Sequence, residues 1–306
     1  MQRAVIDIGS NTVKLFVADI EDGRIIPIVE KDRTTRLGEG LAARDSGPSD
    51  WKRAAADAEI PVAPKLSSAA IARTIQAIDD FLKEARSIGA HDVLALTTSA
   101  VRDAENRDAF LEGVRSRCGL NVQVITGERE AELIFRGVSS DPEWSGRPIL
   151  VVDVGGGSTE FIQGAGPRIE QLRSLPLGAV RLTEKFRDNY TALTEFLSET
   201  LRDSLKNYEI HGRRLIGTGG SGTTAARIVC GLADHTTLSQ DAFRKLLERL
   251  RAMSLPERKK VPGLSPERAD IIVAGGAVFL VAMEVLGAQQ LTISIRNLRY
   301  GALLAT

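Results

Sequence analysis

A short pattern of residues occurs twice in this chain, and its two copies begin 146 positions apart, at Asp7 and Asp153. In each copy an apolar, β-rich run ends in aspartate, glycine follows, and hydroxyl side chains lead into another such run. The copies are Asp7-Ile8-Gly9-Ser10-Asn11-Thr12 and Asp153-Val154-Gly155-Gly156-Gly157-Ser158-Thr159. Because self-similarity at a fixed offset indicates a repeated structural unit, the sequence predicts two similar α/β lobes that face each other across a cleft.

The order of the predicted elements supports this duplication. The N-terminal part is typical of three consecutive antiparallel strands, with a hairpin turn at Asp22 and Gly23. Helices and strands then alternate, as in an α/β lobe, and the strand pattern starts again at residue 149. The expected strands are 3–8, 13–20, 25–30, 93–96, 122–125, 149–152, a run ending at 163, 169–175, 214–217 and 290–295. The expected helices are 68–88, 107–117, 128–138, 192–207, 221–231, 239–253 and 266–286.

The length of 306 residues fits about two domains. We expect an N-terminal lobe over residues 1–127 and a C-terminal lobe with helical additions over 128–306. The last segment, 297–306, could pack back on the N-terminal lobe. Residues 42–64 show little periodicity, and we expect a mobile flap or a partly disordered loop there.

Charge and cysteine content exclude several classes of protein. Forty basic and forty acidic side chains cancel, so electrostatic attachment to nucleic acid or to an anionic membrane is not expected. The two cysteines form no CxxC pair and the three histidines no HExxH motif, which favours a cytoplasmic protein without a zinc site. The apolar run 271–283 is too short to span a bilayer and indicates a buried helix.

Three glycine-rich turns could hold phosphate groups. Glycines permit the positive φ angles at which successive backbone N–H groups converge on an anion, Ser158 and Thr159 add hydroxyl donors, and Asp153 could hold a magnesium ion. A third glycine run, residues 217–222, lies where a predicted strand leads into a helix. No GxxxxGK[ST] motif occurs, which argues against a Walker-type ATPase. Three such turns from separate parts of the chain indicate one shared cleft.

Several segments, in order along nearly the whole chain, resemble the exopolyphosphatase and guanosine pentaphosphate phosphohydrolase (Ppx/GppA) family. They are 4–12, 35–40, 98–104, 151–160, 175–179, 217–221, 262–264 and 268–270. The resemblance implies two ribonuclease H-like lobes of the actin, sugar kinase and Hsp70 superfamily, with the active site between the lobes. It also implies Mg²⁺-dependent hydrolysis of a terminal phosphoanhydride bond.

The resemblance also implies roles for individual residues. Glu130 matches the family's catalytic glutamate, which orients and deprotonates the attacking water, and Asp153 and Glu160 match the magnesium ligands. From the residues alone, Glu128, Glu130 and Glu132 could equally complement the dipole at the start of a helix. Arg102 is the expected cation on the phosphate chain, while Arg36 is either a phosphate ligand or a surface charge. The full set expected to bind phosphate is Ser10, Asn11, Thr12, Arg36, Arg102, Gly155, Gly156, Gly157, Ser158, Gly219, Gly220 and Ser221.

The C-terminal part departs from the family pattern. Residues 294–301 read Ser-Ile-Arg-Asn-Leu-Arg-Tyr-Gly, where family members often have Ser-Asp-x-Gly-Leu-Arg-x-Gly, so a hinge role for this loop is in question. The chain also stops at Thr306, without the additional helical domains of longer members. We therefore expect short polyphosphates to be preferred.

The predicted function is an exopolyphosphatase that releases phosphate from inorganic polyphosphate, in the cytoplasm and as a possible homodimer. A phosphohydrolase that converts pppGpp to ppGpp fits the same residues. An ATP-dependent kinase of the same superfamily and a non-catalytic alarmone-binding module are further alternatives. The retention of Glu130, Asp153 and Glu160 argues against the last, because a binding module needs no base.

Overall fold

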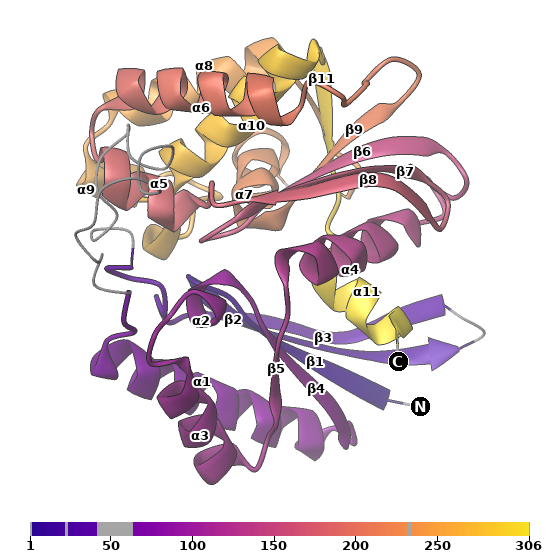
Figure 1. Cartoon of the computed structure of the whole chain (residues 1–306), viewed down its shortest axis with the longest axis vertical. Coiled ribbons are helices and arrows are strands. Elements are labelled where there is room, and N and C mark those ends of the chain that lie inside the picture. The colour runs from indigo at the N-terminus through magenta and orange to yellow at the C-terminus, as the bar shows by residue number, and fades with distance from the viewer. Residues whose placement is uncertain (1, 22–23, 42–63, 232–233, 306) are drawn as a thin grey trace, which may run out of the picture.

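The computed structural model describes residues 2–21, 24–41, 64–231 and 234–305. Two β-sheets form the centres of two lobes, one above the other in Figure 1. The predicted hairpin turn at residues 22–23, and all but the last residue of the loop expected at 42–64, lie outside the described residues.

The first sheet has the strand order β3-β2-β1-β4-β5. Strands β1 (Gln2–Ile8), β2 (Thr12–Glu21) and β3 (Arg24–Thr34) pair antiparallel in sequence order, as predicted. Strand β4 (Asp92–Thr97) pairs parallel with β1, and β5 (Val122–Val124) pairs parallel with β4. The two parallel pairings need helical crossovers, which explains why helices begin only after β3.

The second sheet repeats this order as β8-β7-β6-β9-β11 and adds β10 at its edge. Its strands are β6 (Pro148–Val154), β7 (Thr159–Ala165), β8 (Arg168–Leu175), β9 (Arg214–Thr218), β10 (Thr237–Ser239) and β11 (Gln290–Ile293). Strands β6, β7 and β8 pair antiparallel, and β9 pairs parallel with β6 and with β11. The repeat seen in the sequence is therefore a repeat of topology, and the predicted two-lobe fold class is confirmed.

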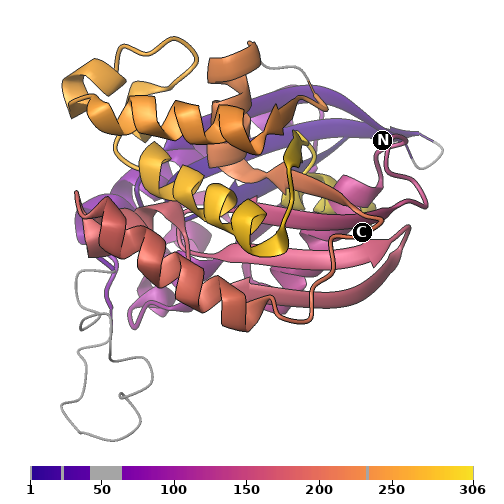
Figure 2. The ribbon, with the colours of Figure 1, turned by 90° about the horizontal axis from the view of Figure 1, so that it is seen from above.

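Helices cover the outer face of each sheet (Figures 1 and 2). On the first sheet α1 (Ser68–Ser87) buries one apolar stripe, including Ile78 and Phe81, and Ser67 caps its N-terminus. The remaining helices around this sheet are α2 (Ser99–Arg102) and α3 (Arg107–Cys118). The second sheet is covered by α5 (Ala179–Phe186), α6 (Tyr190–Ser204), α7 (Gly219–Cys230), α8 (Gln240–Ala252) and α10 (Ile272–Leu286).

Two helices lie between the sheets: α4 (Gly127–Ser139) and α11 (Leu298–Ala305). They share one core with the inner faces of both sheets, in which Val5 comes from β1, Phe135 from α4 and Val151 from β6. Tyr300 of α11 stacks on Phe16 of β2 with ring centroids 4.5 Å apart. Burial on both faces explains why β1 and β6 are apolar runs that do not alternate with polar residues. The domain division after residue 127 remains a prediction.

The helix expected over residues 266–286 is wrong in its first part. A short 3₁₀ turn, Pro266–Arg268, precedes α10, which begins only at Ile272. The break turns Arg268 toward the cleft between the lobes. Short α9 (Leu255–Arg258) was not predicted either. Among the helices described, none is long and apolar enough to cross a membrane.

Candidate active site

The two copies of the repeated pattern meet in the cleft between the lobes. Asp7 lies near the end of β1 and Asp153 near the end of β6, and both line one cavity of about 80 Å³. The turns that follow have the same hydrogen bond, since Gly9 N–H donates to Thr12 O (3.1 Å) and Gly155 N–H to Ser158 O (3.0 Å). A cavity of this size holds about five water-sized atoms, roughly the heavy atoms of one phosphate group.

Equivalent positions on the second strand of each repeat carry opposite charges. Asp153 pairs directly with Glu160 across β6 and β7, as the strand–turn–strand pattern predicted. In the first lobe, Asp7 pairs in the same way with Lys14, and the Lys14 Nζ lies 3.8 Å from an Asp7 carboxylate oxygen. One lobe therefore contributes a cation at the position where the other contributes a carboxylate.

Glu130 lies in the first turn of α4 and is 8% exposed. Its Oε2 has no hydrogen-bond partner within the described part of the chain, and the nearest cation, Arg102 Nη1, is 3.5 Å away. The neighbouring glutamates, Glu128 and Glu132, differ from Glu130 in exposure and in their partners. Glu128 is exposed and its pKa is lowered by backbone N–H groups at the helix start, while Glu132 pairs with Arg129 (2.9 Å). The simple helix-start role thus fits Glu128, while Glu130 is the glutamate that faces the cleft.

The buried carboxylates of this cleft hold protons strongly. Burial raises the pKa of Asp153 to about 6, and burial together with the charge of Asp153 raises that of Glu160 to about 8. Burial and the nearby Glu160 raise the pKa of Glu130 well above its ordinary value, against the opposing effect of Arg102. Like charges confined in a low-dielectric space explain these shifts. The three groups can all be ionised at neutral pH only if further positive charge enters the cleft.

That requirement fits a divalent cation. Asp153 and Glu160 supply hard oxygen donors on one face of the β6–β7 pair, and the unpartnered Glu130 oxygen lies in the same cavity. Within the described residues, the cleft carboxylates do not form a group of three ligand atoms close enough to enclose an ion by themselves. Magnesium commonly takes one or two carboxylates and completes its shell with water and substrate phosphates, so this donor set suits it.

Most of the predicted phosphate-binding residues are brought together here. The cavity wall includes Ser10, Asn11, Thr12, Gly155, Gly156, Ser158, Gly219, Gly220 and Ser221. The last three begin α7, whose unpaired N–H groups favour an anion. Residues 217–222 also have the Gly-x-Gly-x-x-Gly spacing of dinucleotide-binding turns, but the Arg268 guanidinium fills the space beside Gly220.

The expected reason for the glycines is partly wrong. Of the glycines in these turns only Gly219 has a positive φ (86°), and residues 155–157 do not. The glycines are required there by close approach, because a Cβ at Gly157 would collide with the Ser99 hydroxyl, and one at Gly178 with the backbone of Gly156. Gly157 therefore packs the two turns together and lies outside the cavity wall.

The two predicted arginines do not line the cavity. Arg102 donates to Ile125 O (3.0 Å) and lies 3.5 Å from Glu130, so it contacts the candidate base directly. Arg36 forms an ion pair with Asp270 (2.7 Å) of the other lobe. The backbone of Arg36 has a φ of 50°, in the left-handed region, at the tight turn that follows β3.

Two cations in the cleft were missed from the sequence. Lys14 and Arg268 are both half-buried, desolvation lowers the pKa of each, and Arg268 donates only a long bond (3.3 Å) to Thr12 Oγ1. Lys14 could have been found by applying the 146-residue offset to Glu160. Arg268 lies in segment 268–270, one of those that resemble the family, but no role was predicted for it. Its position depends on the break before α10.

A second cavity of about 400 Å³ continues from the cleft between β3 and α7. It shares Lys14, Gly220 and Arg268 with the first cavity. Further out its wall carries three more cations and two carboxylates, namely Lys31, Arg227, Arg299, Glu30 and Asp32. An extended anion that ends in the small cavity would therefore lie along a predominantly basic path.

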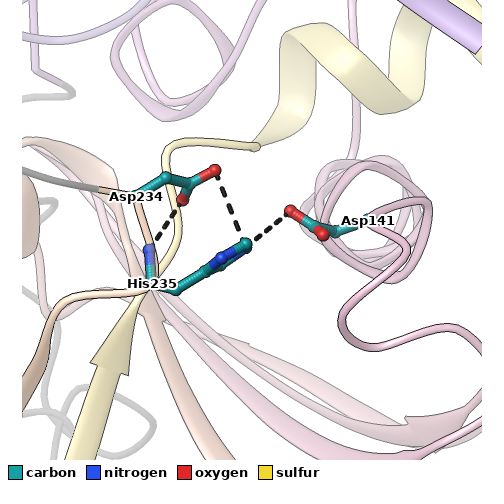
Figure 3. Close-up of side chains that lie close together, drawn as sticks. All are labelled: Asp141, Asp234 and His235. Atoms are coloured by element: carbon teal, nitrogen blue, oxygen red, sulfur yellow. Dashed lines mark hydrogen bonds and ion pairs between the residues drawn. The ribbon is translucent and has the colours of Figure 1, made fainter.

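Asp141, Asp234 and His235 form a separate cluster away from the cleft wall (Figure 3). His235 Nε2 lies 2.9 Å from Asp141 Oδ2, and three ligand atoms of the cluster lie within 4.8 Å of one another. The guanidinium of Arg296 lies 3.3 Å from the same Asp141 oxygen and donates to Ser140 O. Through these contacts the cluster ties the segment that follows α4 to the segment before α11. Arg296 thereby anchors the altered loop at 294–301.

Comparison with known proteins agrees with this geometry. The model of the Ppx/GppA phosphatase family matches residues 16–306. The chain belongs to this family. Exopolyphosphatase 1 of Mycobacterium tuberculosis is 33% identical over 99% of this chain and 88% of its own length. A guanosine-5'-triphosphate,3'-diphosphate pyrophosphatase of Vibrio parahaemolyticus is 29% identical over 97% of this chain and 58% of its own length. The crystal structure of an exopolyphosphatase from Cytophaga hutchinsonii superposes with a TM-score of 0.85 at 26% identity, covering 99% of this chain and 96% of that one.

Proposed function

We propose that this Ppx/GppA protein is a Mg²⁺-dependent exopolyphosphatase that removes the terminal phosphate from short inorganic polyphosphates. One observation carries the proposal. Three anion-binding turns, the Glu130 carboxylate with an Oε2 that accepts no hydrogen bond from the described residues, and the buried carboxylates of Asp7, Asp153 and Glu160 surround a cavity of about one phosphate group. The similarity to exopolyphosphatase 1 of Mycobacterium tuberculosis supports the choice of substrate.

In this proposal the terminal phosphate lies between the two repeated turns. Ser10, Asn11 and Ser158 donate hydrogen bonds to its oxygens, and the N–H groups at the start of α7 face it from a third side. Asp153 and Glu160 would hold Mg²⁺, which would neutralise phosphate charge and polarise the bond that breaks. Lys14 and Arg268 bind the phosphates that follow.

Glu130 acts as the general base. Its Oε2, which accepts no hydrogen bond from the described residues, takes a proton from a water molecule as that water attacks the terminal phosphorus, and the bridging oxygen leaves with the shortened chain. Arg102 keeps the Glu130 carboxylate oriented and favours its ionised form. Because the reaction depends chiefly on positioning and on charge neutralisation, one base with a cation is sufficient.

The basic path beyond the cleft supports a preference for short chains. Its cavity of about 400 Å³ would hold only a few phosphate units, and described cations such as Lys31 (2.5 Å from Glu84) are already paired. We propose that the enzyme acts in the cytoplasm, in accord with its unpaired cysteines, Cys118 and Cys230. A homodimer remains a prediction.

The test is phosphate release measured side by side on tripolyphosphate, long-chain polyphosphate, pppGpp and ATP, with Mg²⁺ and with EDTA. We expect release from tripolyphosphate to exceed release from pppGpp and ATP at equal concentration, and to require Mg²⁺. Faster phosphate release from pppGpp than from tripolyphosphate would show that pppGpp, not polyphosphate, is the preferred substrate. EDTA-resistant release would contradict the metal assignment.

A further inference from the structure

A third cavity, of about 570 Å³, opens at the opposite end of the second sheet from the active site. It lies where β6, β9 and β11 begin, and its wall includes Pro148, Leu215 and Gln290. Asp153 is five residues further along β6 than Pro148, which corresponds to about 17 Å. This groove is therefore separate from the cleft in which hydrolysis is proposed.

The charged residues of this wall are all basic. Arg147, Arg213 and Arg214 line the groove, and no aspartate or glutamate is among its lining residues. Arg213 is held by Glu170 (2.6 Å) and exposed Arg147 by a longer contact with Glu143 (3.4 Å). Arg214 has no carboxylate partner in the described part of the chain. Its guanidinium lies over the Trp144 ring, 5.8 Å from the ring centroid.

Trp144 forms the inner wall of the groove and is 2% exposed. Its indole N–H is buried and makes no hydrogen bond to any described residue, although a buried N–H of this kind normally has a partner. The ring also makes an edge-on contact with His235, with ring centroids 5.3 Å apart. Ile210 and Leu215 add apolar surface, and Gly212 leaves open space where a side chain would stand.

We propose that this groove is a second binding site, for a phosphate-bearing anion. Arg147 and Arg214 bind the phosphate groups, because a guanidinium matches phosphate oxygens in pairs and Arg214 is free to turn from the indole ring. The phosphates could belong to a nucleotide, whose base would rest on Ile210 and Leu215, or to a polyphosphate chain. The site stands independently of the proposed hydrolysis, since none of these residues lines the catalytic cleft.

The intrinsic fluorescence of Trp144 can report binding in this groove. The chain has two tryptophans, so Trp51→Phe leaves Trp144 as the only one, and Glu130→Gln prevents turnover of the probes. Tripolyphosphate and ADP are then titrated separately while the fluorescence of Trp144 is followed. We expect a saturable change with at least one probe. Arg147→Gln with Arg214→Gln should weaken that binding about tenfold or more, as expected for the loss of charge-assisted hydrogen bonds.

Two controls separate this site from the cleft. Arg268→Gln should leave the Trp144 response intact, and Arg244→Gln, which removes a surface arginine paired with Glu284, should also leave it unchanged. A response to ADP alone assigns the site to nucleotides, and a response to tripolyphosphate alone assigns it to polyphosphate. No saturable response to either probe, an unchanged affinity in the double variant, or loss of the response in Arg268→Gln would overturn the proposal. Urea denaturation verifies that each variant is folded.

Discussion

The buried carboxylates predict how the stability of the metal-free protein depends on pH. Asp153 has a pKa of about 6 in the folded chain and an ordinary value of 3.8, so the folded state binds its proton more tightly than the unfolded state does. This proton stabilises the fold fully at pH values below the ordinary pKa, and the stabilisation is lost as pH rises through about 6. Glu160, with a pKa of about 8, extends the loss to higher pH.

The size of the effect follows from these values. One pKa unit corresponds to about 1.4 kcal/mol, so ionisation of Asp153 alone lowers the free energy of unfolding by about 3 kcal/mol in total as pH rises from well below 3.8 to above 6, and about 1.4 kcal/mol of this falls above pH 5. For a chain of this size the total is roughly 6 °C in melting temperature. Glu160 adds to the loss, but the two carboxylates interact, so their contributions are not simply additive. If Mg²⁺ binds the ionised carboxylates as proposed, it should restore stability most at the higher pH.

The assay is urea denaturation in EDTA at several pH values from 5 to 8, repeated with Mg²⁺. Asp153→Asn should reduce the loss of stability between pH 5 and pH 8 by about 1.4 kcal/mol, the part of the Asp153 effect that falls in this range, because the amide does not titrate. Asp241→Asn, a matched change at an exposed aspartate paired with Lys245, should leave it unchanged. A free energy of unfolding that stays constant from pH 5 to 8 without metal would refute the reasoning, as would an undiminished slope in Asp153→Asn.

Three further predictions concern catalysis and motion. Glu130→Gln should lower kcat by about 100-fold or more. In the control variant Glu128→Gln, at an exposed glutamate two residues away, kcat should stay within threefold of the wild-type value. Equal effects of the two substitutions on kcat would show that Glu130 is not the base. Arg36→Gln removes the 2.7 Å pair with Asp270, so small-angle scattering should show a larger particle that tripolyphosphate compacts, and KM should rise more than kcat falls. An unchanged scattering profile would mean that this pair does not hold the cleft closed. Long polyphosphate should shorten gradually on a gel, since the basic path is short; full-length chains persisting beside free phosphate would show processive action.

The sequence was most informative where one local pattern determines one local structure. The aspartate–glycine–hydroxyl pattern predicted both turns, and the register of Asp153 with Glu160 followed from the length of the turn between their strands. Periodicity predicted the helix that carries Glu130, the resemblance to the family singled out this glutamate from its neighbours, and the structure places it at the cleft. Helix periodicity, in contrast, did not separate α10 from the turn before it, because Ser265-Pro266-Glu267 is also a good helix start.

Contacts between the lobes could not be predicted in this way. Arg36 with Asp270, and Arg268 with Thr12, join residues more than 230 positions apart, and no periodicity relates them. The conformational reason for the glycines of residues 155–157 was also wrong, since Gly156 and Gly157 are constrained by the approach of Ser10 and Ser99 from the other lobe. Such constraints arise only when the lobes are assembled, and a single sequence carries no local sign of them.

The difference between Lys14 and Glu160 accounts for how a duplicated fold forms an asymmetric site. In two identical lobes, four carboxylates at the positions of residues 7, 14, 153 and 160 would face one small cavity, and a polyanionic substrate would be repelled. Lysine at position 14 lies 3.8 Å from Asp7, and its charge favours the ionised form of Asp153. In the proposed mechanism the turns of both lobes bind phosphate, and only the second lobe supplies the carboxylate pair that would hold the cation. On this reasoning Lys14→Met should raise the pKa of Asp153 further and increase the Mg²⁺ concentration needed for half-maximal activity. A metal requirement that does not change would show that Lys14 serves the substrate alone.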